Sequence, residues 1–401
     1  MIQTAPLWAF VDIRPSNVDK KSKKNESPVR LVNYTDVYYN RYIFTNLNLM
    51  SATASDEHIE RFRVLPGDII ITKDSETPDD IGIPAEVMSA DQDMICAYHL
   101  ALLRPRSNNV CPRFVYWAME SSTSKDYWIT SSFGVTRYSI GSGTISRLPI
   151  LDVPFNTQRT IANYLDRETG RIDAMIAKLD DMTETLSIRR AFEIETFTTR
   201  LPKPFTRMAF CGNVVLGKTY QGEKKNDGEI LVNYVRAASL QSNGLELDDQ
   251  RMWMTVDDLD KYDLKRGDVL IVEGGAGFGR SVVLKEDMPG WGFQNHVIRV
   301  RPNRNYDGRF LDYCVKGHYS DGLINILAEG ATIPGFSSEK TRNLPIADLS
   351  LEEQIRIADH LDEATSKIDA MLTKVVELKA LLIERRSALI TEVVTGRKKV
   401  V

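Results

Sequence analysis

The sequence has few cysteines, no long apolar run and little net charge, and each shortage excludes a class of protein. The four cysteines form no C-x-x-C pair, so we expect reduced thiols, a cytoplasmic location and no structural zinc site. No apolar stretch approaches the ~20 residues that span a bilayer, so we expect no membrane segment. The net charge of −4 is unusual for a free-standing nucleic-acid binder, which is usually basic. Any binding to nucleic acid must therefore depend on local cationic loops or on partner subunits.

What the 401 residues do contain is a long internal repeat. Residues 148–190 and 344–386 align without a gap at an offset of 196, and 18 of the 43 positions are identical. The shared positions include LPI, Gln158/Gln354, Ile161-Ala162/Ile357-Ala358, Leu165-Asp166/Leu361-Asp362, the IDAM runs at 172–175 and 368–371, and Arg189-Arg190/Arg385-Arg386.

The segments before these blocks repeat more faintly, at offsets that fall from 200 to 196. The matches are LVNY at 31–34 and 231–234, Gly67-Asp68 and Gly267-Asp268, His99 and His296, and Arg104-Pro105 and Arg301-Pro302. The repeat predicts globular units at 1–145 and 201–340 and helical units at 146–200 and 341–401.

The two helical units carry apolar residues at mixed intervals of 3, 4 and 7, which is the pattern of a coiled-coil seam. The seam positions are Ile161, Leu165, Ile172, Met175, Leu179, Met182 and Leu186, and Ile357, Leu361, Ile368, Met371, Val375, Leu378, Leu382, Leu389 and Val393. Ser350-x-x-Glu353 forms a capping box at the start of the second helix.

A helix over 157–196 would be ~60 Å long, and pairing with its repeat buries its apolar stripe most simply. We therefore predict an α+β fold, in which two mixed α/β globular units are separated by two long helices. We expect the helices to pair as an antiparallel coiled coil with pseudo-twofold symmetry, which would put the globular units at opposite ends.

The octapeptide "GNVVLGKT" at 212–219 matches the P-loop pattern G-x-x-x-x-G-K-[ST]. The interior of the match looks like a strand, however, and the segment after it looks like a turn where a P-loop needs a helix. The aligned positions of the first repeat, Asp12, Asn17, Val18 and Asp19, could not hold a phosphate. A P-loop NTPase using Gly212–Thr219 stays open as an alternative, and "EGGAGFGR" at 273–280 is interpreted as a flexible Gly-rich loop.

The chain consists of a variable unit, a helix with LPI, Gln, IA, LD and ID, a second variable unit and the same helix again. This order resembles that of the specificity (S) subunits of Type I restriction-modification systems, and the resemblance covers nearly the whole chain. It implies that the globular units are target recognition domains, each reading one half of a split target in double-stranded DNA. It also implies that the helices fix the spacer and bind two methyltransferase (modification) subunits, with two restriction subunits as further possible partners.

The resemblance implies a non-catalytic chain that binds no cofactor or metal. S-adenosylmethionine, ATP and Mg²⁺ would be held by the partners, which methylate adenine N6 and cleave DNA. The residues agree independently, because the chain has no Pro-Pro pair and so lacks the acidic- or Asn-Pro-Pro-aromatic loop of adenine methyltransferases.

Candidate DNA contacts come from loops that the internal alignment matches, because Arg, Lys and Gln side chains reach base edges while Ser and Thr hold phosphates. His99 and His296 are interpreted as structural residues of apolar strands. The candidates are Lys20, Lys21, Lys23, Lys24, Lys73, Ser75, Thr136, Arg137 and Tyr138 in the first unit, and Lys218, Thr219, Tyr220, Gln221, Lys224, Lys225, Gly277, Arg280 and Thr332 in the second. A coiled-coil scaffold without DNA contact is the other alternative.

Overall fold

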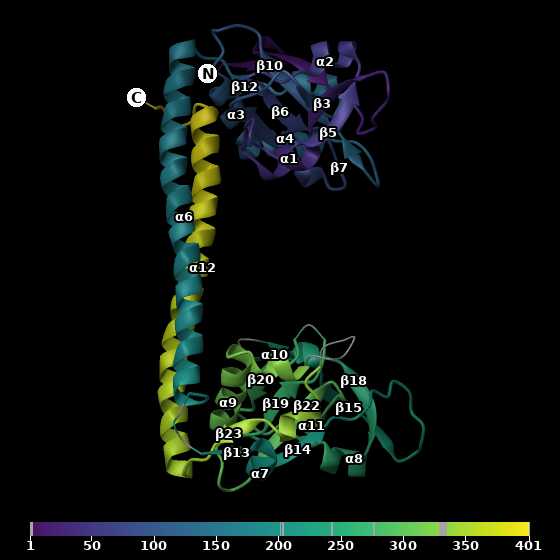
Figure 1. Ribbon diagram of the computed structural model, residues 1–401, viewed down its shortest axis with the longest axis vertical. Coiled ribbons are helices and arrows are strands. Elements are labelled where there is room, and N and C mark those ends of the chain that lie inside the picture. Colours follow the sequence, from purple (N-terminus) through teal and green to yellow (C-terminus); the bar gives the residue numbers. More distant parts are fainter. Residues whose placement is uncertain are drawn as a thin grey trace. The chain divides into compact units, whose positions relative to one another are not determined.

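The computed structural model describes residues 3–200, 202, 204–241, 244–275, 277–328 and 335–400. It divides into two compact units, unit 1 (Met1–Leu179 with Val376–Val401) and unit 2 (Asp180–Val375). Each unit contains one α/β globular part and segments of both long helices, α6 (Phe155–Phe197) and α12 (Leu351–Val394) (Figure 1). Among the described residues, none of the helices has an apolar stretch that could cross a bilayer.

The globular part of unit 1 is built on a five-stranded sheet of order β2-β10-β6-β8-β4 and a three-stranded sheet of order β5-β3-β9. Its strands are β1 (Thr4–Pro6), β2 (Val11–Pro15), β3 (Ser27–Val32), β4 (Tyr42–Ile43), β5 (Met50–Ala54), β6 (Ile69–Thr72), β7 (Asp74–Ser75), β8 (Pro84–Val87), β9 (Met94–Cys96), β10 (Leu100–Pro105), β11 (Tyr138–Ser139) and β12 (Pro149–Leu151). Its helices are η1 (Leu7–Ala9), α1 (Tyr34–Tyr39), α2 (Asp56–Phe62), η2 (Pro78–Asp80), α3 (Pro112–Glu120), α4 (Ser122–Ser131) and α5 (Ser142–Ser146).

The globular part of unit 2 has a four-stranded sheet of order β14-β22-β19-β20 and a three-stranded sheet of order β18-β15-β21. Its strands are β13 (Phe205–Arg207), β14 (Gly212–Leu216), β15 (Glu229–Val235), β16 (Leu240–Gln241), β17 (Gly244–Leu245), β18 (Arg251–Thr255), β19 (Val269–Val272), β20 (Ser281–Val283), β21 (Trp291–Phe293), β22 (Val297–Pro302) and β23 (Pro345–Ala347). Its helices are α7 (Met208–Cys211), η3 (Ala237–Ser239), α8 (Val256–Lys261), α9 (Gly308–Ser320), α10 (Leu323–Ala328) and α11 (Ser338–Arg342).

The two globular parts share one topology, which confirms the faint repeat seen in the sequence. The order β2-β10-β6-β8 in unit 1 matches β14-β22-β19-β20 in unit 2, and β5-β3-β9 matches β18-β15-β21. The central strands are buried on both faces. Ile69 and Ile71 pack toward α3 while Ile70 packs toward the small sheet, as the alternation of side chains along a strand requires.

A repeated ion pair supports the large sheet of each unit. The Arg104 guanidinium contacts the buried Asp68 carboxylate at 2.9 and 2.7 Å, and Arg301 contacts Asp268 at 2.8 and 2.7 Å. Each aspartate also accepts a hydrogen bond from the backbone N–H three residues earlier, at 2.7 Å in unit 1 and 2.8 Å in unit 2. The Gly-Asp and Arg-Pro matches of the sequence therefore mark one structural ion pair, present twice.

The shared glutamines attach each globular part to its long helix. In unit 1 the Gln158 side chain accepts a hydrogen bond from the Cys111 N–H at the start of α3 and donates one to the Val153 carbonyl, both at 2.9 Å. In unit 2 Gln354 accepts from the Asp307 N–H at the start of α9, at 3.0 Å, and donates to the Leu349 carbonyl at 2.9 Å. Both glutamines are buried.

Within each unit the two long helices run antiparallel and are joined by residues of the repeat itself. In unit 1 Arg386 Nε contacts Asp173 Oδ1 at 2.9 Å, and in unit 2 Arg190 Nε contacts Asp369 Oδ1 at 2.9 Å. The arginine of one repeat therefore pairs with the aspartate of the other, which confirms antiparallel pairing. The predicted capping box also forms, with Ser350 and Glu353 exchanging hydrogen bonds at 3.1 and 3.3 Å.

The predicted seam is correct in part. Positions such as Ile172, Leu186, Ile368 and Leu382 are buried, but the predicted seam residues Met175, Met182, Met371 and Leu378 are exposed. Two paired helices cover only one side of each other, so one flank of an a/d stripe stays in solvent unless another chain covers it.

The octapeptide 212–219 is not a phosphate-binding loop. Gly212–Leu216 forms β14, which pairs antiparallel with β22, and no helix follows it before β15 in the described chain. A Cβ at Gly212 would lie 2.4 Å from the Arg301 carbonyl oxygen, and one at Gly217 would lie 2.2 Å from that of Gln294. The two glycines are needed because the neighbouring backbone approaches closely at both positions. The match of this segment to the P-loop pattern is therefore a coincidence.

Candidate nucleic-acid interface

The predicted loops of unit 1 meet at the turn before β10. The Tyr98 N–H donates to the Val18 carbonyl at 2.8 Å, and the Lys73 N–H donates to the His99 carbonyl at 2.9 Å. The loop after Val18 and the segment after β6 are thus held against the same turn. We call residues 18–24, 73–75, 98–99 and 133–139 the unit 1 loop cluster.

Asp74 is at the centre of the unit 1 loop cluster. Its carboxylate accepts a hydrogen bond from the Ser139 hydroxyl, contacts His99 Nδ1 at 2.9 Å and pairs with Lys73 Nζ at 3.0 Å. Burial by itself raises the pKa of Asp74, but the hydrogen bonds from Ser139, His99 and Lys73 outweigh it and lower the pKa below its usual value. Asp74 therefore stays ionised and holds three segments of the cluster together.

A short hairpin carries the predicted residues at 136–138. β11 pairs with β7, with Tyr138 opposite Ser75, and a bridge joins Phe133 to Ser139. Thr136 and Arg137 lie exposed at the hairpin end, whereas Tyr138 packs partly against the core. Arg137 Nη2 lies 3.3 Å from His99 Nε2, and Arg137 makes no ion pair with a carboxylate of the described chain.

Within the 18–24 loop of this cluster, Lys20 is the lysine that lies near the turn at 98–99. Lys20 Nζ lies 5.7 Å from the centroid of the Tyr98 ring, which itself lies 3.9 Å from the His99 ring. Lys23 is paired with Glu26 at 3.1 Å, while Lys20, Lys21 and Lys24 make no ion pair within the described chain. Cations without a carboxylate partner can bind phosphates without first breaking an ion pair of their own.

Unit 2 uses the same backbone frame with different side chains. The Asn295 N–H donates to the Lys218 carbonyl and the Glu273 N–H donates to the His296 carbonyl, both at 2.9 Å. His296 is 55 % exposed, and its Nδ1 lies 3.6 Å from a Glu273 oxygen. We call residues 218–225, 273–275, 277–280 and 294–296 the unit 2 loop cluster.

Three of the nine predicted contact residues of unit 2 are engaged within the protein. Lys218 Nζ pairs with Asp258 at 2.8 Å, the Gln221 amide donates to Glu229 at 2.8 Å, and Arg280 donates to the Leu240 carbonyl at 2.9 Å. Thr219 and Tyr220 are exposed.

The other candidates of unit 2 are less tightly held. Lys224 lies 5.8 Å from the Trp253 ring centroid and 4.0 Å from Asp227, and the Lys225 side chain is exposed. Gly277 has room for a Cβ, whose nearest neighbour would be the Arg280 guanidinium at 3.5 Å. Thr332 lies outside the described residues.

The two histidines lie in turns, not in the apolar strands expected from the sequence. Their turns precede β10 and β22, and His99 is the centre of contacts that the sequence did not predict. The available signal was their repeated position between the two candidate loops. The strand assignment failed because apolar residues lie on both sides of each turn.

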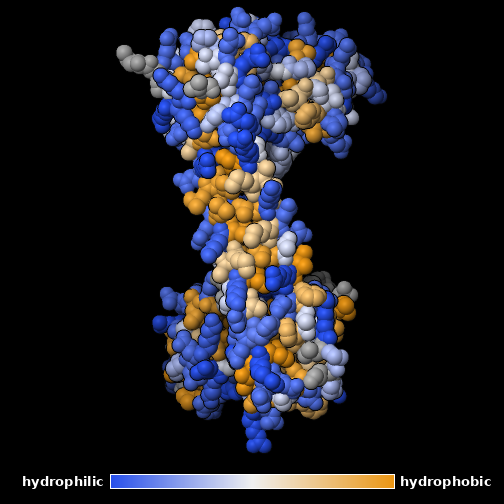
Figure 2. All heavy atoms as spheres, turned by 90° about the vertical axis from the view of Figure 1, so that its left-hand side faces the viewer, coloured by the Kyte–Doolittle hydropathy of each residue, from blue (hydrophilic) through white to orange (hydrophobic). Residues whose placement is uncertain are grey.

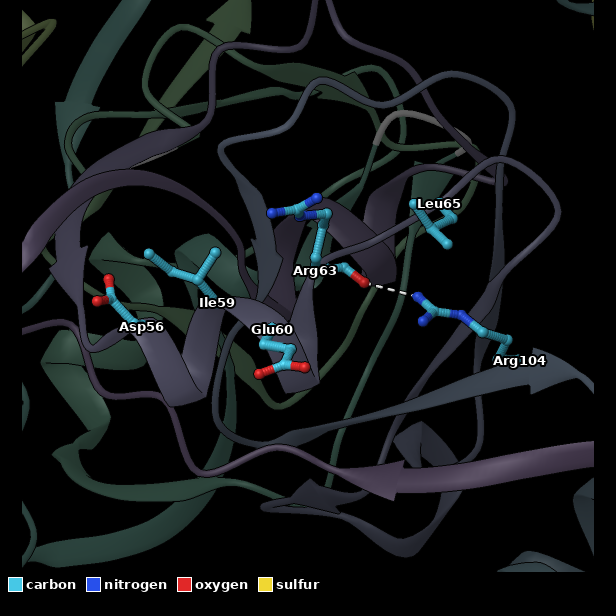
Figure 3. A pocket seen from close by; sticks show the side chains of 6 residues that line it. All are labelled: Asp56, Ile59, Glu60, Arg63, Leu65 and Arg104. Carbon is cyan, nitrogen blue, oxygen red and sulfur yellow. Dashed lines mark hydrogen bonds between the residues drawn. The ribbon is translucent and has the colours of Figure 1, made fainter.

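A hollow of about 380 Å³ elsewhere in unit 1 is structural in character (Figure 3). Arg104 at its edge donates to the Arg63 carbonyl at 2.7 Å and is also paired with Asp68. Asp56 and Glu60 of α2 make its opposite wall acidic, which is unsuitable for a phosphate. In the described ranges no cluster of three or more His, Cys, Asp or Glu residues could hold a metal ion.

Comparison with known proteins gives a consistent result. Residues 212–380 match the family described as Type I restriction modification DNA specificity domain. One similar solved chain is part of a structure that describes the complex assembly and conformational transition of the type I R-M system. It has a TM-score of 0.77 and 15 % identity, over 99 % of this chain and 98 % of that one. The HsdS subunit from Thermoanaerobacter tengcongensis has a TM-score of 0.57 and 14 % identity, over 99 % and 97 % of the two chains. No curated protein matches the sequence.

Proposed function

We propose that the whole chain belongs to the DNA specificity family of Type I restriction-modification systems, whose domain matches residues 212–380, and that it reads a two-part DNA target for a partner methyltransferase. Each globular part would read one half of the target. The observation that carries this proposal is the twofold use of one fold with dissimilar loop clusters. A shared frame with different contact residues suits two half-sites of different sequence.

The first loop cluster supports contact with DNA. It presents Lys20, Lys21, Lys24 and Arg137, none of which makes an ion pair with a carboxylate among the described residues. Arg and Lys side chains of this kind bind phosphates, and Arg also reads the O6 and N7 atoms of guanine. The second cluster would depend more on Tyr220, Lys224, Lys225 and backbone groups, because Lys218 and Arg280 are engaged.

Exposed apolar side chains on the long helices support the binding of partner subunits. Figure 2 shows hydrophobic residues gathered on the exposed helix surface. The exposed apolar residues of the two long helices include Met175, Val376, Leu381 and Ile383 in unit 1, and Met182, Ile188, Phe192 and Met371 in unit 2. Apolar surface that gathers in this way usually marks a protein–protein interface.

We propose that two modification subunits bind these surfaces, one for each repeat of the helix, and that restriction subunits join the same assembly. The helices would set the spacer between the half-sites. The partners would bring S-adenosylmethionine, ATP and Mg²⁺, because this chain lacks the Pro-Pro loop of an adenine methyltransferase. Their positive charge would also compensate for the chain's net charge of −4.

A triple substitution tests the contact with DNA. Lys20, Lys21 and Lys24 are changed together to Ala in the complex with the modification subunits, and DNA affinity is measured at several salt concentrations. We expect weaker binding and a salt slope that falls by about 0.9 for each phosphate that is no longer neutralised. Lys125→Ala, in α4 of the same unit, is the control. Unchanged affinity and slope in the triple variant would favour a scaffold without DNA contact.

A further inference from the structure

The backbone at His99 is unusual. Its φ is 69°, and it is the one residue other than glycine with a positive φ in the described part of the chain. A side chain in this left-handed region crowds the following carbonyl oxygen, so such residues persist only where the surroundings hold them. Strain of this kind is concentrated at functional sites.

The surroundings of His99 hold both its backbone and its ring. The carbonyl accepts from the Lys73 N–H at 2.9 Å, and Nδ1 lies 2.9 Å from the ionised Asp74 carboxylate. Asp74 in turn accepts a hydrogen bond from Ser139 in β11, the strand that pairs with β7. The ring orientation is thus tied to the strand pair that carries Arg137.

The second ring nitrogen faces Arg137. A guanidinium can only donate, so at 3.3 Å from Arg137 Nη2 the His99 Nε2 atom must be the acceptor. Nδ1 then carries the proton and donates it to Asp74, which defines a neutral imidazole tautomer. A carboxylate in the same place would neutralise the charge of Arg137, whereas the neutral imidazole orients the guanidinium and leaves its charge and its remaining donors for DNA.

We propose that His99 is a positioning residue for sequence reading by the first globular part, because it holds Arg137 ready to contact a guanine edge. The inference rests on the proposed DNA-reading function and deepens it. It applies to one half-site. In unit 2 His296 lacks the left-handed backbone, its neighbour is Glu273, and the position aligned with Arg137 is Ile333 in the sequence.

The test is a double-mutant cycle in the complex with the modification subunits. His99→Asn tolerates the left-handed backbone and can still donate to Asp74, but it is too short to reach Arg137. His99→Gly tolerates the backbone and removes the ring altogether. Each is combined with Arg137→Ala, and His58→Asn in α2 serves as the control histidine substitution. Cognate DNA and DNA with a mismatch in either half-site are titrated, with melting temperatures as a check on folding.

We expect His99→Asn and His99→Gly each to weaken cognate binding about tenfold, which is within the range that one good base contact contributes. Neither should weaken it further once Arg137 is Ala, and the reduced discrimination should concern the first half-site alone. Equal losses in both backgrounds, equal effects on both half-sites, or wild-type affinity in Arg137→Ala would overturn the inference. If the wild-type complex itself shows no preference for any sequence, the proposed function fails, which is a separate result.

Discussion

At the scale of single residues, the structure is stabilised by polar contacts that occur once in each unit. In the sequence these contacts are visible only as identical residues at aligned positions of the two repeats. Asp68 and Asp268 are almost completely buried, and each receives two hydrogen bonds from an arginine and one from the backbone. A carboxylate can be buried in this way only because its oxygens are satisfied.

Replacing Asp68 by Asn should therefore destabilise unit 1. The buried site loses its charge while Arg104 keeps its own, and removal of one partner of such a pair costs about 3 kcal/mol. Denaturant unfolding of Asp68→Asn measures this loss. The matched control is Asp56→Asn at the exposed start of α2, which loses only a favourable interaction with the helix dipole, about 0.5 kcal/mol. Similar losses for the two variants would contradict the structural role of Asp68.

The contacts of Asp74 lead to a prediction about how stability depends on pH. The folded pKa of Asp74 lies below its usual value, so its contribution to stability is complete above the unfolded pKa of about 3.9 and is lost as pH falls through the lower folded pKa. Ser139→Ala removes one of the hydrogen bonds that lower the pKa, so the pKa of Asp74 should rise. Carboxyl NMR titration checks both statements, with Ser146→Ala in α5 as the control. Titration of wild-type Asp74 at or above the usual value would refute them.

At the scale of elements, the pairing of the long helices is set by contacts between residues of the two repeats. The ion pairs Asp173–Arg386 and Asp369–Arg190 occupy equivalent positions of the repeat. Unit 1 also joins Ser122 at the start of α4 to Thr391 of α12, with Ser122 N and Oγ at 2.9 and 3.0 Å from Thr391 Oγ1. Polar contacts of this kind select one register for helices whose apolar stripe alone would allow several.

Exchanging the two charges of the unit 1 pair tests this register. Asp173→Arg and Arg386→Asp should each destabilise the protein by about 1 kcal/mol, because each puts like charges together. The double variant should recover part of that loss but not all of it, because Arg41, 3.1 Å from Asp173, and Glu120, 4.0 Å from Arg386, would then face like charges. Thermal unfolding of the four proteins gives the coupling energy. Strictly additive effects would mean that the two side chains do not interact.

The helices were predictable from the sequence because the repeat shows the same apolar spacing and the same polar residues twice, and several of those polar residues attach or pair the helices. Gln158 satisfies backbone groups, the Asp166 carboxylate accepts from the Trp117 indole at 2.8 Å, and Arg386 reaches Asp173. The exposure of Met175 and Met371 was not predictable, because the seam pattern does not state how many chains cover it. Under the proposed function, a partner subunit that covers this flank would account for its apolar residues.

The loop clusters were predictable in location but not in detail. The internal alignment identified both loops of each unit because the frame around Val18 and Lys218 is shared. It could not identify the left-handed turn at His99, which depends on contacts with Asp74 and Arg137 from distant parts of the chain. Nor could it show that Lys218 is already paired with Asp258, because that partner is 40 residues away.

At the scale of the whole molecule, one chain contains two versions of the same reader with different loop clusters. The distance and direction between the two globular parts stay a prediction. The net charge of −4 predicts weak binding by the chain alone and stronger binding when basic partners join it. Under the proposed function, two dissimilar readers in one chain would give an asymmetric target, which two identical subunits could not recognise.

The most direct test of this account is a genome-wide map of methylated adenines after co-expression with the modification subunits, with residues 1–145 exchanged for those of a relative in a second strain. We predict a two-part motif with a fixed gap, in which the exchange changes one part and leaves the other part and the gap unchanged. A single continuous motif, or a change in both parts, would contradict the claim that each globular part reads its own half of the target.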